Sequence, residues 1–177
     1  MRAKRKRAGR ARPNTGGSLP DPSRFVKAVF FLPAALDTPR PGPAQQRLAD
    51  LLEAVESGDA AQVAELISQE APPPVRNTPA VWAFLRQRLD QLMRDGLAAG
   101  LAGLPGQVPV SDASALRAVT ASALVIAGRG DDLHPVAVAE QLAEVLPTAT
   151  LYVYDRPGVI WTERADLRER ISSFLND

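Results

Sequence analysis

The chain has 177 residues, of which 45% are apolar, 5% aromatic and 23% charged, and this composition suits one globular domain or part of a larger one. It contains no cysteine, which excludes disulfides, thiolate zinc sites and a cysteine nucleophile, and its single histidine excludes a multi-histidine metal site. The longest apolar run, residues 28–36, is far shorter than the roughly 20 residues of a membrane-spanning helix. We therefore expect a soluble, cytoplasmic protein without a cofactor.

Charge is distributed unevenly along the chain. Seven of the 21 basic residues precede residue 13, so the remaining 14 basic and 20 acidic residues give positions 13–177 a net charge of −6. The first 24 residues contain no aromatic residue, several prolines and glycines, and no apolar segment of the kind that a secretory signal needs. We interpret residues 1–24 as a disordered basic leader, in preference to a tail that binds nucleic acid or an anionic membrane.

The pattern of apolar residues predicts a strand followed by two short helices. Residues 25–32 are almost continuously apolar, rich in β-branched and aromatic side chains, and end at Pro33, as a buried strand of a parallel sheet does. In residues 43–55 and 59–67 the apolar positions recur at spacings of three and four, with Gly58 between the two segments. These spacings are typical of amphipathic helices.

A proline-rich linker and a third helix are expected next. Residues 71–75 include three consecutive prolines, which remove backbone donors and restrict their neighbours. Thr78 followed by Pro79 is a good start for a helix, which we expect to run to 96–100. The arginines of this helix are predicted to form its solvated face: Arg86, Arg88 and Arg94.

The last third of the chain alternates between strands and helices. Residues 123–127 and 151–154 are predicted strands, and helices are predicted from Pro135 and over 165–175. Strand and helix in alternation predict a parallel α/β unit with a right-handed crossover. Because ligands bind at the carboxyl ends of strands in such sheets, we expect a site at residues 129–134 and 155–161.

The two predicted strand ends resemble the last part of an α/β hydrolase. Residues 128–135, Gly-Arg-Gly-Asp-Asp-Leu-His-Pro, match the G-x-x-D-x-x-x-P context in which that family carries its catalytic acid. The resemblance covers about 150 residues and implies a partial α/β-hydrolase-like parallel sheet of about three strands over 25–177, with residues 43–105 as a helical cap insertion. It implies the acid role for Asp131. Where the family carries its histidine base, this chain has Val159.

The resemblance also shows what is missing. A hydrolase of this family would place the first strands, an oxyanion loop and a G-x-S-x-G nucleophile elbow before Phe25, and 24 residues leave no room for them. The nearest approach, residues 16–20, lacks a preceding strand and ends in proline, so we interpret it as a coincidence. The chain is thus expected to be the C-terminal half of a hydrolase fold, truncated and catalytically impaired, with a pseudoenzyme as one interpretation.

Three residues are candidates for the site, and each has a structural alternative. Asp131 is either the acid or a cap of the following helix. His134, the single imidazole, is either a displaced base or an ordinary turn residue. Trp161 lines a substrate pocket or packs on a core strand. No metal ligand set is predicted.

Two functions follow from these observations. The first is serine-type hydrolysis of an ester, thioester or amide, acting on a small apolar acyl substrate. The alternative is a non-catalytic module that binds a small molecule or a protein. In either case we expect self-association through the exposed edge of the strand at Phe25–Leu32, and nucleic acid is not expected as a partner.

Overall fold

The described part of the chain contains a three-stranded parallel sheet in the order β1-β2-β3. The computed structural model describes residues 25–40, 42–94 and 106–177. The strands are β1 (Lys27–Phe31), β2 (Ser122–Gly128) and β3 (Ala149–Tyr154). Both strand pairs are parallel, with Lys27 opposite Ser122 and Ala123 opposite Ala149. This confirms the predicted partial parallel sheet. The predicted leader, residues 1–24, lies outside the described residues.

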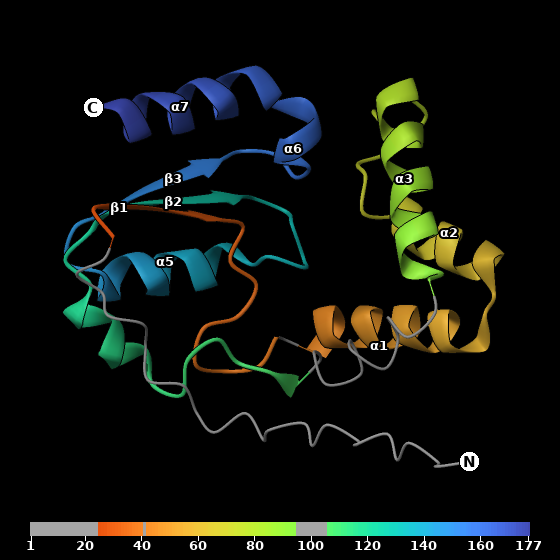
Figure 1. Cartoon of the computed structure of the whole chain (residues 1–177), viewed down its shortest axis with the longest axis horizontal. Coiled ribbons are helices and arrows are strands. Elements are labelled where there is room, and N and C mark those ends of the chain that lie inside the picture. The colour runs from red at the N-terminus through yellow and green to blue at the C-terminus, as the bar shows by residue number, and fades with distance from the viewer. Residues whose placement is uncertain (1–24, 41, 95–105) are drawn as a thin grey trace, which may run out of the picture.

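The central strand β2 is buried on both faces. Successive side chains of a strand point to opposite faces, so β2 contributes to two separate cores. Helix α5 (Val136–Val145) covers one face and helix α7 (Arg164–Asn176) covers the other (Figure 1). On the first face Ala123, Val125 and Ala127 pack with residues of α5, and on the second Leu124 and Ile126 pack with residues of α7.

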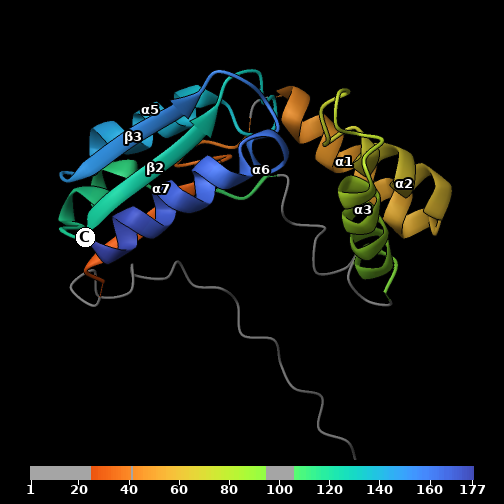
Figure 2. The ribbon, with the colours of Figure 1, turned by 90° about the horizontal axis from the view of Figure 1, so that it is seen from above.

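Between β1 and β2, the described part of the chain contains three α-helices that lie beyond the carboxyl ends of the strands (Figure 2). They are α1 (Gly42–Ser57), α2 (Ala60–Ser68) and α3 (Pro79–Leu92). Asp59 caps α2 by accepting a hydrogen bond from the amide of Gln62 at 3.0 Å, and Thr78 caps α3 by accepting one from the amide of Val81. The three helices share a core of their own, which includes Val63, Ile67 and Val81, each at most 1% exposed.

The structure differs from the predicted elements in three places. The third helix ends at Leu92, where the amide of Arg94 bonds to the carbonyl of Gln91 three residues back, and the predicted end at 96–100 lies outside the described residues. Two short helices were not predicted, η3 (Ala113–Ala118) and α6 (Val159–Thr162). Both are too short to produce the periodicity on which helix prediction depends.

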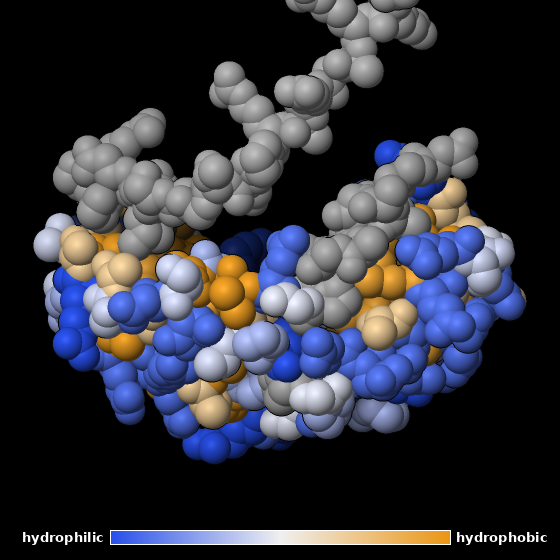
Figure 3. All heavy atoms as spheres, turned by 90° about the horizontal axis from the view of Figure 1, so that it is seen from below, coloured by the Kyte–Doolittle hydropathy of each residue, from blue (hydrophilic) through white to orange (hydrophobic). Residues whose placement is uncertain are grey.

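The described residues are mainly hydrophilic on one face of the molecule. In Figure 3, hydrophilic residues predominate over the coloured part of this face, and hydrophobic residues show in separate places. Among the described residues, no helix has the length and apolar character that crossing a bilayer requires.

A contact between Pro72 and Gly158 joins the helical layer to the end of β3. Gly158 has φ of 73°, a backbone conformation that side chains disfavour. A Cβ atom on Gly158 would also overlap the ring of Pro72, which lies in the linker between α2 and α3. Glycine is therefore favoured at position 158 for two reasons: its backbone conformation disfavours a side chain, and the ring of Pro72 leaves no room for one.

We predict that Gly158→Ala lowers the free energy of unfolding by more than Gly58→Ala does. Gly58 has nearly the same φ, 75°, but a Cβ atom there would meet nothing within 4 Å. Gly58→Ala should therefore show the backbone penalty alone, about 1–2 kcal/mol, and Gly158→Ala should lose more because Pro72 must move. Urea unfolding of both variants measures the difference, and equal losses would contradict the contact.

Candidate functional site

The turn after β2 is organised by the carboxylate of Asp131. Its Oδ1 accepts hydrogen bonds from the amides of Leu133 at 3.0 Å and His134 at 3.1 Å. Its Oδ2 lies 3.0 Å from Nδ1 of the His134 ring. Gly130, with φ of 74°, turns the chain between the strand and this loop, and Pro135 leads into α5. One carboxylate thus holds both the backbone of the turn and the imidazole that the turn carries.

The electrostatics of this pair favour an ionised aspartate. The Asp131 side chain is only 17% exposed and His134 is 32% exposed. Burial by itself raises the pKa of the Asp131 carboxyl, but the hydrogen bond and charge of His134 and the two backbone amides outweigh it, so its pKa is lower than usual. A carboxylate beside Nδ1 favours the tautomer with the proton on Nδ1, which leaves the lone pair on Nε2.

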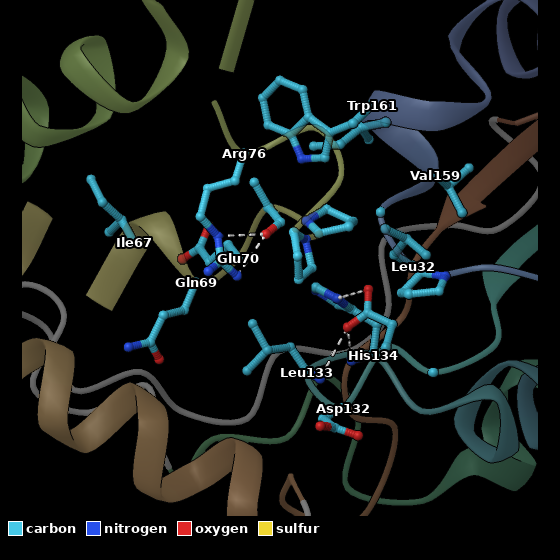
Figure 4. A pocket seen from close by; sticks show the side chains of 18 of the residues that line it. Leu32, Ile67, Gln69, Glu70, Arg76, Asp132, Leu133, His134, Val159 and Trp161 are labelled. Atoms are coloured by element: carbon cyan, nitrogen blue, oxygen red, sulfur yellow. Dashed lines mark hydrogen bonds and ion pairs between the residues drawn. The ribbon is translucent and has the colours of Figure 1, made fainter. Parts of the chain in front are cut away.

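A cavity of about 280 Å³ lies beside this pair and is shared by the sheet and the helical layer. Asp131, His134 and Trp161 all line it, so the structure brings the three predicted site residues together. Figure 4 shows Glu70 and Arg76 on one side of the cavity, Leu133 and His134 on another, and Trp161 on a third. Trp161 also packs edge to face on Phe84, with ring centroids 5.0 Å apart. It therefore lines the cavity and joins α6 to α3.

Position 159, where the resemblance places a histidine, is occupied by an apolar valine. Its side chain is 1% exposed and belongs to the core between the sheet and α7. It packs so closely on the end of β2 that a Cβ atom on Gly128 would lie 2.8 Å from Val159 Cγ2. The valine at position 159 cannot transfer a proton. Because His134 is the single histidine of the chain, it is the imidazole available to the cavity.

Sequence reasoning missed an ion pair at the wall of this cavity. Arg88, which was predicted on the solvated face of α3, is half-buried, and its guanidinium lies 3.0 Å from the carboxylate of Glu70. Burial raises the pKa of Glu70, although the nearby charges of Arg88, Arg47 and His134 act in the opposite direction. No local pattern signals this pair, because its members lie on either side of the proline linker. The expectation for Arg88 was wrong for that reason.

Two further expectations concern a nucleophile elbow and a metal site. Residues 16–20, the nearest sequence approach to a nucleophile elbow, lie outside the described residues. Among the residues that the structure does describe, no group of three or more histidine, aspartate or glutamate side chains is placed to hold a metal ion.

We predict that Asp131→Asn destabilises the fold more at neutral pH than in acid. A carboxyl whose pKa is lowered on folding stabilises the folded state above its unfolded pKa, and this contribution is lost as the pH falls through the folded value. The variant should lose about 1–3 kcal/mol at about pH 7 and clearly less at about pH 3. Urea unfolding at both pH values measures the difference, and a loss that does not change with pH would contradict this assignment.

Comparison with known proteins gives no match at the level of sequence families. Neither the protein-family models nor the curated proteins include a match to this chain. Solved structures do match it. An α/β hydrolase from a Medee basin deep-sea metagenome library has a TM-score of 0.64 and 15% identity, with 84% of this chain and 55% of that chain covered.

Two further structures agree with this match. The enol-lactonase from Burkholderia xenovorans LB400 has a TM-score of 0.66 and 16% identity, with 87% of this chain and 57% of that chain covered. An esterase from Exiguobacterium antarcticum has a TM-score of 0.61 and 18% identity, with 86% and 57% covered. The chain thus spans little more than half the length of the hydrolases that it matches. Its described residues have part of the α/β-hydrolase fold.

Proposed function

We propose that this chain is a serine-type hydrolase of the α/β-hydrolase fold that acts on an ester, thioester or amide of a small acyl compound. The observation that carries the proposal is the 3.0 Å contact between Asp131 and His134 beside the cavity. The names of two similar structures, an esterase and an enol-lactonase, favour ester cleavage within this range.

In this proposal Asp131 orients His134, and His134 is the general base. Nε2 of His134 accepts the proton of an attacking hydroxyl, the ionised Asp131 stabilises the imidazolium that forms, and the same proton then passes to the leaving group. Among the described residues no serine hydroxyl is hydrogen-bonded to His134. A hydroxyl that no base contacts is a weak nucleophile, so we propose that the chain by itself is catalytically impaired.

The division of the chain follows from the same proposal. We assign residues 25–177 to the hydrolase domain, residues 43–105 to its cap and residues 1–24 to a leader. The position of α1, α2 and α3 beyond the carboxyl ends of the strands supports the cap assignment, since these helices and the linker after α2 line the cavity together with the strand-end turns.

We predict slow hydrolysis of p-nitrophenyl butyrate by the full chain, at a rate above that of buffer. His134→Gln and Asp131→Asn should each lower this rate by about tenfold or more, because a positioned base contributes about 100-fold or more in most enzymes. Asp155→Asn is the matched control, since Asp155 stands at the end of the neighbouring strand β3 and is 93% exposed. A parent rate equal to that of buffer, or variants as active as the parent, would refute the catalytic proposal.

The second candidate function is a binding module without catalysis. Val159 favours it, because the position at which the resemblance expects the base is a buried core residue. Binding of small acyl compounds in the cavity without turnover would support the binding module.

We also propose that the chain self-associates through the edge of β1. This strand pairs with β2 on one side and with no other strand in the described part of the chain. Large apolar residues are exposed in and beside it: Phe25 at 54%, Val26 at 83% and Phe31 at 36%. An edge that combines unpaired backbone groups with exposed apolar side chains favours pairing with another copy.

Sedimentation velocity tests this proposal. We predict a dimer or larger species for the parent, and a shift toward monomer for Val26→Lys, because a charge at a strand edge opposes pairing. Trp82→Lys is the control, since Trp82 is 57% exposed on α3, in the helical layer and not at the β1 edge. A parent that remains monomeric at high concentration would count against the β1 edge as an interface.

A further inference from the structure

A second cleft adjoins the His134 cavity and combines apolar walls with arginines. It has a volume of about 380 Å³ and shares Arg47, Glu70 and His134 with the cavity described above. Its walls come mainly from α1, from the end of β1 and from the turn after β2. The apolar residues that line it include Leu48 and Leu51 of α1 and Phe84 of α3.

The charges in this cleft do not balance. Arg40, Arg47 and Arg88 line it together with one acidic residue, Glu70, and Arg40 already has an interaction of its own. Glu70 is already neutralised by its 3.0 Å ion pair with Arg88. The cleft therefore carries a positive charge, although positions 13–177 as a whole have a net charge of −6.

Arg47 is the arginine whose charge remains available. It is half-buried on α1, and among the described residues no carboxylate lies within ion-pair distance of its guanidinium. In addition, the buried Nε of Arg88 has no hydrogen-bond partner within that part of the chain. A half-buried guanidinium without a counterion favours binding of an anion, since burial weakens the hydration that would otherwise stabilise it.

We propose that this cleft binds a small monocarboxylate with an apolar body. Arg47 holds the carboxylate, with Arg88 beside it, and the apolar body packs on the leucines of α1 and on Phe84. A guanidinium binds a planar carboxylate through two parallel hydrogen bonds, and one carboxylate balances the one unpaired charge. An apolar wall excludes water and strengthens this interaction.

This inference deepens the proposed function, because it names an anionic acyl compound as the substrate class. It concerns binding alone, however. A ligand whose carboxylate is held by Arg47 extends from α1 toward His134, which lines the same cleft. A second functional group of the ligand is thereby brought next to the base.

Isothermal titration of the full chain with 4-phenylbutanoate and with 4-phenylbutanamide tests the proposal. The two probes have the same apolar body and differ in charge. We expect the acid to bind about tenfold or more tightly than the amide, which corresponds to about 1.4 kcal/mol. Equal affinity for acid and amide, or no binding of the acid, would overturn the proposal.

Variants of the parent chain locate the contact. Arg47→Gln should weaken binding of the acid by about tenfold or more and leave the affinity for the amide unchanged. Arg117→Gln is the matched control, because Arg117 is exposed on η3 and lines neither cleft. Undiminished acid binding by Arg47→Gln would overturn the assignment. If Arg47→Gln does not fold, two other measurements test the assignment. They are the affinity of Arg47→Lys for the acid, and the difference between the affinities of the parent for the acid and for the amide.

The outcome is independent of the proposed hydrolysis. A chain that binds the acid through Arg47 but shows no ester turnover refutes the catalytic proposal alone. A chain that hydrolyses p-nitrophenyl butyrate but does not distinguish the acid from the amide refutes the carboxylate site alone.

Discussion

The candidate site depends on the carboxylate of Asp131. Its two oxygens contact two backbone amides and one imidazole nitrogen within a single turn, so the shape of the turn and the direction of the ring are set together. The turn begins at the end of β2, and β2 is buried between α5 and α7. A strand packed on both faces is a rigid base for a functional loop, because few other arrangements of its side chains fill the same space.

The helices between β1 and β2 complete the site by a small set of contacts. Pro72 packs on Gly158, Phe84 packs on Trp161, and His134 shares its cavity with Glu70. The helical layer has its own core, and these contacts join that layer to the strand ends. The cavity is thus formed between two separately packed layers, as ligand sites often are.

The sequence predicts those parts of the molecule that depend on local patterns. The apolar run of β2, the cap Thr78 and the position of Asp131 after a strand are all visible in the sequence, and the resemblance implied the fold. The pair of Arg88 and Glu70 and the cleft around Arg47 were not predictable, because they arise from packing between helices. Periodicity identified the helix that carries Arg88 and assigned this arginine to the wrong environment. The roles proposed for Asp131, His134 and Trp161 stay predictions.

The tautomer of His134 tests the central claim most directly. His134 is the single histidine of the chain, so a long-range ¹H–¹⁵N correlation spectrum of the untagged protein contains one set of imidazole signals. We predict that the neutral ring carries its proton on Nδ1 in the parent and shifts toward the Nε2 form in Asp131→Ala. A parent ring protonated on Nε2, or identical spectra for the parent and the variant, would contradict it.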